Sequence, residues 1–140
     1  MEKNELTVAR LVAQMGEVGR RLSEIGAAEA AAGNISVCVR ELLDVEERFP
    51  RMTVVDLPEP APDLAGATVI VSGSGRRLRE IADAPAANLA CIFIMDGGAK
   101  GKMFTSAESQ FKRVTSEFNS HLAIHHDQMR TRPVRLHAVL

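Results

Sequence analysis

Three groups of residues have types and spacings that could do chemistry, and the first is Gly73-Ser74-Gly75, which follows an apolar run. Glycines let the backbone turn tightly, and a serine hydroxyl with consecutive backbone amides can bind a phosphate. An ordinary tight turn would use the same residues. Two nucleotide motifs are incomplete: Leu78 stands where GxGxxG needs its third glycine, and no Gly-Lys-Ser/Thr of a P-loop follows. The run is therefore a candidate anion-binding turn.

The second group is Thr115-Ser116-Glu117. A helix N-cap followed by an acidic residue gives this pattern, because the helix dipole favours a negative charge at that end. The same residues could instead act as a hydroxyl pair that binds an anion, next to a carboxylate that moves a proton. Both interpretations stay open at this point.

The third group consists of histidines. His121 and His125 are four residues apart, so both lie on one helix face together with Glu117, and these three side chains could hold a zinc ion. Half-buried histidines on a polar helix would give the same spacing. The HExxH signature of zinc proteases is absent. His137 follows the predicted helix and is a separate candidate.

The elements that must position these groups can be read from the apolar pattern. A helical period covers residues 5–31, with a plausible break at Gly26, and residues 117–129 form a second predicted helix. Alternating or β-branched runs predict strands at 35–40, 68–72, 89–95, 102–104 and from 134 onward, with a hairpin turn at 96–98. Three prolines make 57–67 a loop. The chemical groups therefore fall at or near the ends of predicted elements.

Composition narrows the class of protein. The 140 residues fit one domain, residues 1–140, with 17 basic and 18 acidic side chains and a net charge of −1. This balance, and the absence of Trp and Tyr, argue against a nucleic-acid partner. No run is long and apolar enough to span a membrane, and no signal core begins the chain. Cys38 and Cys91 are interpreted as small buried hydrophobes, and the expected location is the cytoplasm.

Four segments appear in an order that resembles the class II aldolase/adducin family: residues 32–37, 71–76, 83–89 and 115–117. The resemblance implies an α/β fold, three-layer α/β/α around a largely antiparallel central sheet, incomplete here at its C-terminus. It also implies a homotetramer and a zinc-dependent retro-aldol cleavage of a sugar phosphate. Zinc as a Lewis acid would stabilise the enediolate that forms beside the carbonyl.

The family's roles carry over by position. Glu117 matches the acid/base that moves the proton. His137 matches the first residue of a His-x-His zinc pair. The positions that hold the substrate phosphate are matched by Asn34, Ser74, Gly75, Thr115 and Ser116. We therefore expect Asn34, Ser74 and Ser116 to converge, with Ser74 within about 10 Å of Ser116, a span that one phosphate with its hydrogen bonds can bridge.

The sequence departs from the family pattern at two positions. Ala31 stands where an additional phosphate-binding Asn is common. If His137 is the first histidine of the zinc pair, Val139 stands where the second belongs; alternatively, the pair lies beyond Leu140. Because a catalytic zinc normally takes three protein ligands, we expect these 140 residues alone to bind zinc weakly and to be inactive. The alternatives are a non-catalytic, adducin-like assembly module, another lyase or epimerase of the family, and a small metal-binding module using Glu117, His121 and His125.

Overall fold

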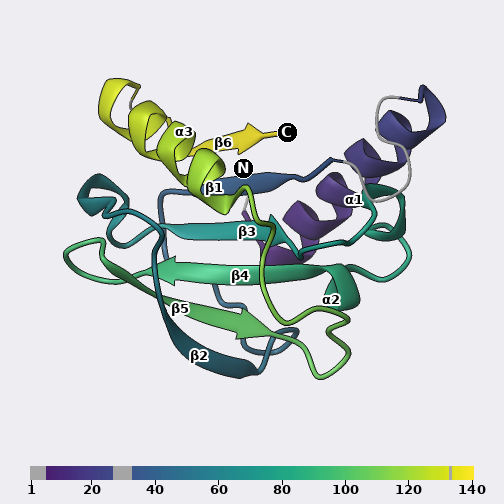
Figure 1. Cartoon of the computed structure of the whole chain (residues 1–140), viewed down its shortest axis with the longest axis horizontal. Coiled ribbons are helices and arrows are strands. Elements are labelled where there is room, and N and C mark those ends of the chain that lie inside the picture. The colour runs from purple at the N-terminus through teal and green to yellow at the C-terminus, as the bar shows by residue number, and fades with distance from the viewer. Residues whose placement is uncertain (1–5, 27–32, 133) are drawn as a thin grey trace, which may run out of the picture.

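The computed structural model describes residues 6–26, 33–132 and 134–140, and its centre is a six-stranded sheet in the order β2-β5-β4-β3-β1-β6 (Figure 1). Every adjacent pair is antiparallel. The strands are β1 (Ser36–Val39), β2 (Arg51–Asp56), β3 (Thr68–Ser72), β4 (Leu89–Ile94), β5 (Lys100–Thr105) and β6 (Leu136–Val139). The helices are α1 (Val8–Glu24), α2 (Pro85–Asn88) and α3 (Phe118–Thr131), with 3-10 turns η1 (Pro62–Leu64) and η2 (Leu78–Glu80).

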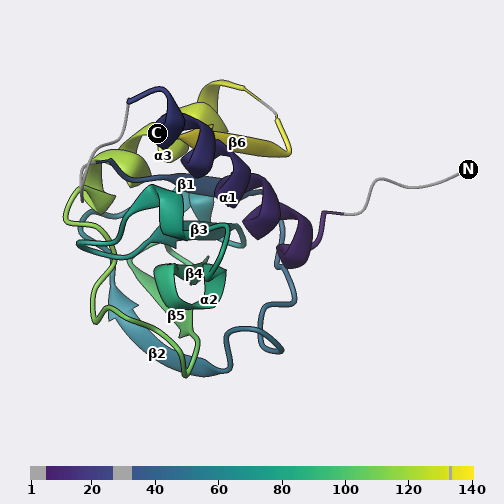
Figure 2. The same cartoon turned by 90° about the vertical axis from the view of Figure 1, so that its right-hand side faces the viewer.

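Helices cover both faces of this sheet. Successive strand residues point to opposite faces, so Ile70 packs in a core with α1, whereas Val69 and Val71 pack in a second core with α3. Figure 2 shows α1 and α3 on opposite sides of the strands. The predicted three-layer α/β/α arrangement with an antiparallel sheet is therefore confirmed.

Helix α1 lies unusually close to its neighbours. Thr7 caps it by accepting a hydrogen bond from the backbone N–H of Arg10 at 3.2 Å, and Leu11 is buried on the sheet side. A Cβ atom at Gly16 would stand 2.6 Å from the Ala82 backbone, so only glycine permits this approach. The helix ends at Glu24, just before Gly26 with its φ of 74°, so the predicted break there is confirmed. The Ala-rich stretch at 27–32, part of the predicted 5–31 period, lies outside the described residues.

The main error in the predicted elements is β2, for which the sequence analysis gave no strand. It is one of the two edge strands of the sheet, paired only with β5, and five of its six residues are exposed. Alternation between apolar and polar residues arises when one face of a strand is buried. This strand buries neither face well, so its sequence carries no such period.

The other five strands and α3 match their predictions to within a few residues, whereas α2 and the two 3-10 turns had not been predicted. The β4–β5 hairpin turns at Gly97 and Gly98, whose φ angles of 86° and 70° favour glycine. Cys38 and Cys91 are free, buried thiols, as predicted. Within the described ranges, no helix has both the length and the apolar character to cross a membrane.

Candidate functional site

The two predicted anion-binding segments lie side by side. The N–H of Ser74 donates to the Arg113 carbonyl at 2.8 Å, and the N–H of Thr115 donates to the Ser72 carbonyl at 2.9 Å. Gly73 and Val114 form an antiparallel bridge between these bonds. The loop before α3 therefore runs along the end of β3, next to Gly73-Ser74-Gly75.

The two glycines of the turn serve different purposes. A Cβ atom at Gly73 would overlap the ring of Phe111, so glycine is needed there for space. Gly75 has open space around it but a φ of 73°, so glycine is needed there for its backbone conformation. Ser74 and Gly75 are both exposed, which leaves them accessible to a ligand.

Asn34 reaches the same end of the sheet. It precedes β1, and the next residue, Ile35, donates its N–H to the Ser72 hydroxyl at 3.0 Å. The Asn34 side chain donates from Nδ2 to Oε2 of Glu117 at 3.2 Å. The structure therefore brings Asn34 into contact with Glu117, two residues that are 83 positions apart in the sequence.

The beginning of α3 differs from the predicted cap. Thr115 and Ser116 were the expected capping residues, but the N-cap is Glu117, and its side chain makes no capping hydrogen bond. The buried Thr115 hydroxyl instead accepts from the N–H of Glu117 at 3.3 Å, while Ser116 is exposed. The Glu117 carboxylate is thus held by Asn34 and is not used to cap the helix.

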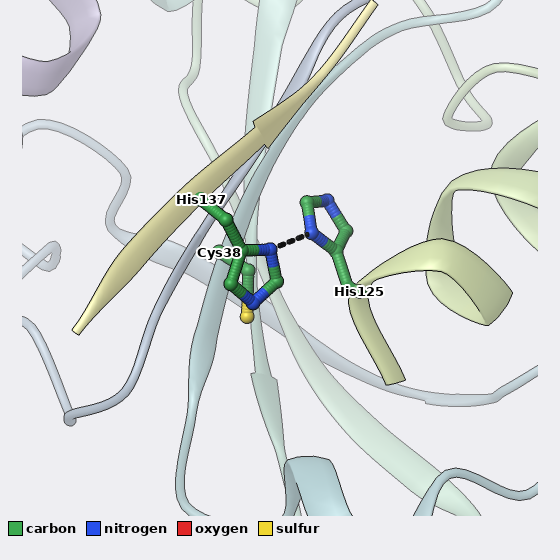
Figure 3. Close-up of side chains that lie close together, drawn as sticks. All are labelled: Cys38, His125 and His137. Atoms are coloured by element: carbon green, nitrogen blue, oxygen red, sulfur yellow. Dashed lines mark hydrogen bonds between the residues drawn. The ribbon is translucent and has the colours of Figure 1, made fainter. Parts of the chain in front are cut away.

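A chain of side-chain hydrogen bonds continues inward from this contact. His121 Nε2 bonds Asn34 Oδ1, and the Ser36 hydroxyl lies 2.6 Å from both His121 Nδ1 and His125 Nε2. His125 Nδ1 lies 2.7 Å from His137 Nδ1 (Figure 3). We call this chain the relay, and its members in order are Glu117, Asn34, His121, Ser36, His125 and His137.

The inner part of the relay is buried and uncharged. Ser36 and His125 are fully buried, and His121 is 2% exposed. Burial, with smaller contributions from His137 and His121, lowers the pKa of His125 to about 3. Burial also lowers the pKa of His121, against a smaller opposing effect of Glu117, and lowers that of His137, with a contribution from Arg40. The three imidazoles are therefore neutral at pH 7.

One group of possible metal ligands comes together among the described residues. The ligand atoms of Cys38, His125 and His137 all lie within 4.8 Å of one another (Figure 3). Cys38 on β1 pairs directly with His137 on β6. Burial raises the pKa of Cys38 to about 12, which keeps it a thiol. His137 Nε2 is buried and has no hydrogen-bond partner.

The sequence analysis missed Ser36 and Cys38, because each looked like an ordinary residue of an apolar strand. It correctly placed His121 and His125 on one face of α3. These two rings do not meet Glu117 around a common point as the three-ligand hypothesis required, since both bond the Ser36 hydroxyl and Asn34 separates His121 from the carboxylate.

Comparisons with known proteins agree with this architecture. The chain is 32% identical over 127 residues to a rhamnulose-1-phosphate aldolase of Bacteroides thetaiotaomicron, covering 89% of this chain and 46% of that protein. It is 33% identical over 122 residues to a rhamnulose-1-phosphate aldolase of Listeria welshimeri, covering 84% and 42%. A scan against protein-family models finds no match.

A solved structure shares the fold. The crystal structure of a sugar-phosphate aldolase from Thermotoga maritima superposes with a TM-score of 0.71 at 22% identity, over 89% of this chain and 50% of that one. The chain is thus similar in sequence to sugar-phosphate aldolases and shares the fold of one, which confirms the resemblance seen in its sequence. The curated relatives that it matches are rhamnulose-1-phosphate aldolases, and it spans less than half of their length.

The family resemblance implies a zinc ion, and only some of the residues present have side chains that could bind it. His137 Nε2, buried without a partner, suits one ligand position. Val139, at the second position of the His-x-His pair, has no side-chain donor atom. The family's three-ligand set is therefore incomplete in the described part of the chain.

Proposed function

We propose that this chain forms the phosphate-binding and proton-transferring part of an aldolase that cleaves a ketose 1-phosphate. The proposed substrate is L-rhamnulose 1-phosphate, and the products are dihydroxyacetone phosphate and L-lactaldehyde. The observation that carries the proposal is the contact between Asn34 and Glu117, located where the Ser74 turn and the Ser116 loop run side by side. The similarity to rhamnulose-1-phosphate aldolases supports the choice of substrate.

In this proposal the phosphate binds to the exposed turn. The hydroxyl groups of Ser74 and Ser116 and the backbone amide of Gly75 are donors suited to an anion. The binding energy of the phosphate, which does not react, orients the carbon skeleton toward Glu117. Thr115 holds the loop by accepting a backbone hydrogen bond, and its hydroxyl keeps its own hydrogen to donate to the phosphate.

Glu117 moves the proton at the carbon next to the carbonyl. In the cleavage direction, the hydroxyl group that becomes the aldehyde oxygen loses its proton to solvent water as the carbon–carbon bond breaks. The electron pair of that bond stays on the dihydroxyacetone phosphate half as an enediolate, and Glu117 as the acid protonates that carbon. In the synthesis direction the carboxylate removes the same proton. Asn34 holds Oε2 of the carboxylate and leaves Oε1 to take part in the transfer.

Zinc, the homotetramer and the cytoplasmic location belong to the same proposal and follow from the family resemblance. When bound in the complete enzyme, zinc would polarise the carbonyl and stabilise the enediolate. An assembly module of the adducin kind would have no chemical use for a carboxylate held by Asn34. The polar contacts therefore favour the enzyme over that alternative.

The phosphate site can be tested on the chain itself. Titration of dihydroxyacetone phosphate into the ¹⁵N-labelled protein should shift the amide signals of Ser74, Gly75 and Ser116. Ser116→Ala should weaken binding about tenfold, the usual consequence of losing one hydrogen bond to a charged group at about 1.5 kcal/mol. Ser120→Ala, an exposed serine in the first turn of α3, is the matched control. If both variants bind dihydroxyacetone phosphate with the same affinity, the phosphate does not bind at this surface.

A further inference from the structure

The relay connects the proposed acid/base to His137 through three buried residues, Ser36, His121 and His125, that the resemblance to the family gives no role. We infer that these three residues are positioning residues: they pass on the hydrogen-bond direction that the Glu117 carboxylate imposes, hold the Asn34 amide toward Glu117, and fix His137 as the tautomer whose Nε2 carries a free lone pair. The use of this arrangement in catalysis rests on the proposed function, but the tautomers themselves do not.

The direction of the outer bonds follows from the Glu117 carboxylate. A carboxylate has no hydrogen to donate, so Asn34 must turn its NH₂ group toward Glu117 and its Oδ1 toward His121. His121 must then donate from Nε2–H to that oxygen. Because a neutral imidazole carries one hydrogen only, His121 Nδ1 is an acceptor and takes the hydroxyl hydrogen of Ser36 at 2.6 Å.

The inner bonds follow from the single hydrogen of Ser36. Since that hydrogen is used toward His121, the bond to His125 Nε2 at 2.6 Å requires His125 to donate. His125 Nδ1 is then the acceptor, and His137 must donate from Nδ1–H across the 2.7 Å contact. This leaves the lone pair of His137 on Nε2, which is the buried nitrogen that has no partner.

This assignment separates the roles of the two inner histidines. Both nitrogens of His125 are occupied within the relay, so His125 orients its neighbours and is not available as a metal ligand unless one of these bonds breaks. His137, with one nitrogen anchored and the other free, has the arrangement of a metal-binding imidazole, whose second nitrogen is normally held by a hydrogen bond. Ser36 is the central residue, because it is the only link between His121 and His125 in the relay.

Nitrogen NMR of the ¹⁵N-histidine-labelled protein at pH 7, without metal or substrate, measures the tautomers directly. We expect His137 to be protonated at Nδ1 and bare at Nε2, and His121 and His125 to be protonated at Nε2 and bare at Nδ1. His126 lies outside the relay beside Asp63 and serves as an internal reference. The opposite tautomer at His137, or fast averaging between tautomers at all three rings, would overturn the inference.

Ser36→Ala removes the central hydroxyl group. His121 and His137 should then exchange between their two tautomers and give averaged nitrogen signals. Ser106→Ala is the control, since Ser106 is also buried and accepts a backbone hydrogen bond, from Glu108, outside the relay. Unchanged histidine signals in folded Ser36→Ala would contradict the positioning role. If Ser36→Ala does not fold, the wild-type tautomers still decide the inference. Because no substrate is used, failure here is distinct from failure of the phosphate titration.

Discussion

The exposed turn around Ser74 and Ser116 and the buried relay around Ser36 meet at Asn34, yet they are built in opposite ways. In the exposed turn, backbone hydrogen bonds between two segments of the chain set the geometry, and the side chains stay accessible. In the relay the side chains bond one another in the interior, and no backbone group takes part. A ligand can therefore bind at the turn with little rearrangement of the protein. In the relay, by contrast, a substitution at one residue alters the hydrogen bonds of the residues next to it.

The largest expected effect lies at the junction of the two regions, at Glu117. Glu117→Gln keeps the size of the side chain and can still accept from Asn34, but it cannot carry the proton. In a full-length, active form of the enzyme, kcat should fall by about 10²–10⁴-fold, a contribution typical of general acid–base groups. Steady-state kinetics with L-rhamnulose 1-phosphate measures this.

The melting temperature of the same variant separates catalysis from helix stabilisation. An acid that only favours the N-terminus of α3 would contribute about 0.3–1 kcal/mol of stability and nothing to turnover. Normal kcat with a lowered melting temperature would therefore take Glu117 out of the mechanism.

The second-largest expected effect is a pH dependence of the free energy of unfolding that comes from the relay. The pKa of His125 is about 3 in the fold, below the value of about 6.5 expected in the unfolded chain. The unfolded state therefore binds more protons between these values, and the free energy of unfolding should fall as pH drops below 6.5. The loss should reach about 2 kcal/mol by pH 5, from about 1.4 kcal/mol per pH unit. Urea unfolding from pH 7 to pH 5 measures it.

A matched pair of variants locates this pH dependence. His125→Gln should reduce the slope over that range and leave the part that comes from His121 and His137, whose pKa values are also lowered by burial, although the variant is less stable at pH 7. His126→Gln, on the same helix but outside the relay, should keep the wild-type slope. A slope that persists in full in His125→Gln and disappears in His126→Gln would place the titrating group outside the relay.

The smallest effect should come from the exposed turn. Gly75→Ala introduces no clash, because nothing lies within 4 Å of the added Cβ, but it places an L-residue at a φ of 73°. The cost should be about 1 kcal/mol of unfolding free energy, as for other L-residues in left-handed conformations. Gly73→Ala, which would overlap Phe111, should cost more. Equal losses in thermal unfolding of the two variants would contradict the distinct roles given to these glycines.

The same contrast explains what could be predicted from the sequence. Gly73-Ser74-Gly75 and Thr115-Ser116-Glu117 are short local patterns, so their residue types pointed to a site before their proximity was visible. Only the helical members of the relay, Glu117, His121 and His125, have a local pattern. Ser36 and His137 come from strands about a hundred residues apart, and only the pairing of β1 with β6 brings these strands together. Strand β2 escaped prediction for a related reason, because an exposed edge strand lacks the apolar period that buried strands show.

Cys38 shows a further limit of the sequence. A cysteine in an apolar strand is usually a small hydrophobe, and the fold confirms that it is buried. Its position opposite His137 follows from strand register, which the sequence of β1 alone does not specify. Side-chain chemistry could be predicted where it was local, and not where it depended on pairing between distant strands.

The claim that the exposed turn and the relay form one site is tested most directly by the dissociation constant of dihydroxyacetone phosphate for Asn34→Ala, measured beside wild type. Asn34 would join the two regions, since one N–H of its amide bonds Glu117 in the relay and the other is the donor that the family resemblance assigns to the substrate phosphate. Loss of one hydrogen bond to a charged ligand at about 1.5–3 kcal/mol predicts binding weaker by about 10- to 150-fold. A folded variant that binds dihydroxyacetone phosphate as tightly as wild type would contradict the account.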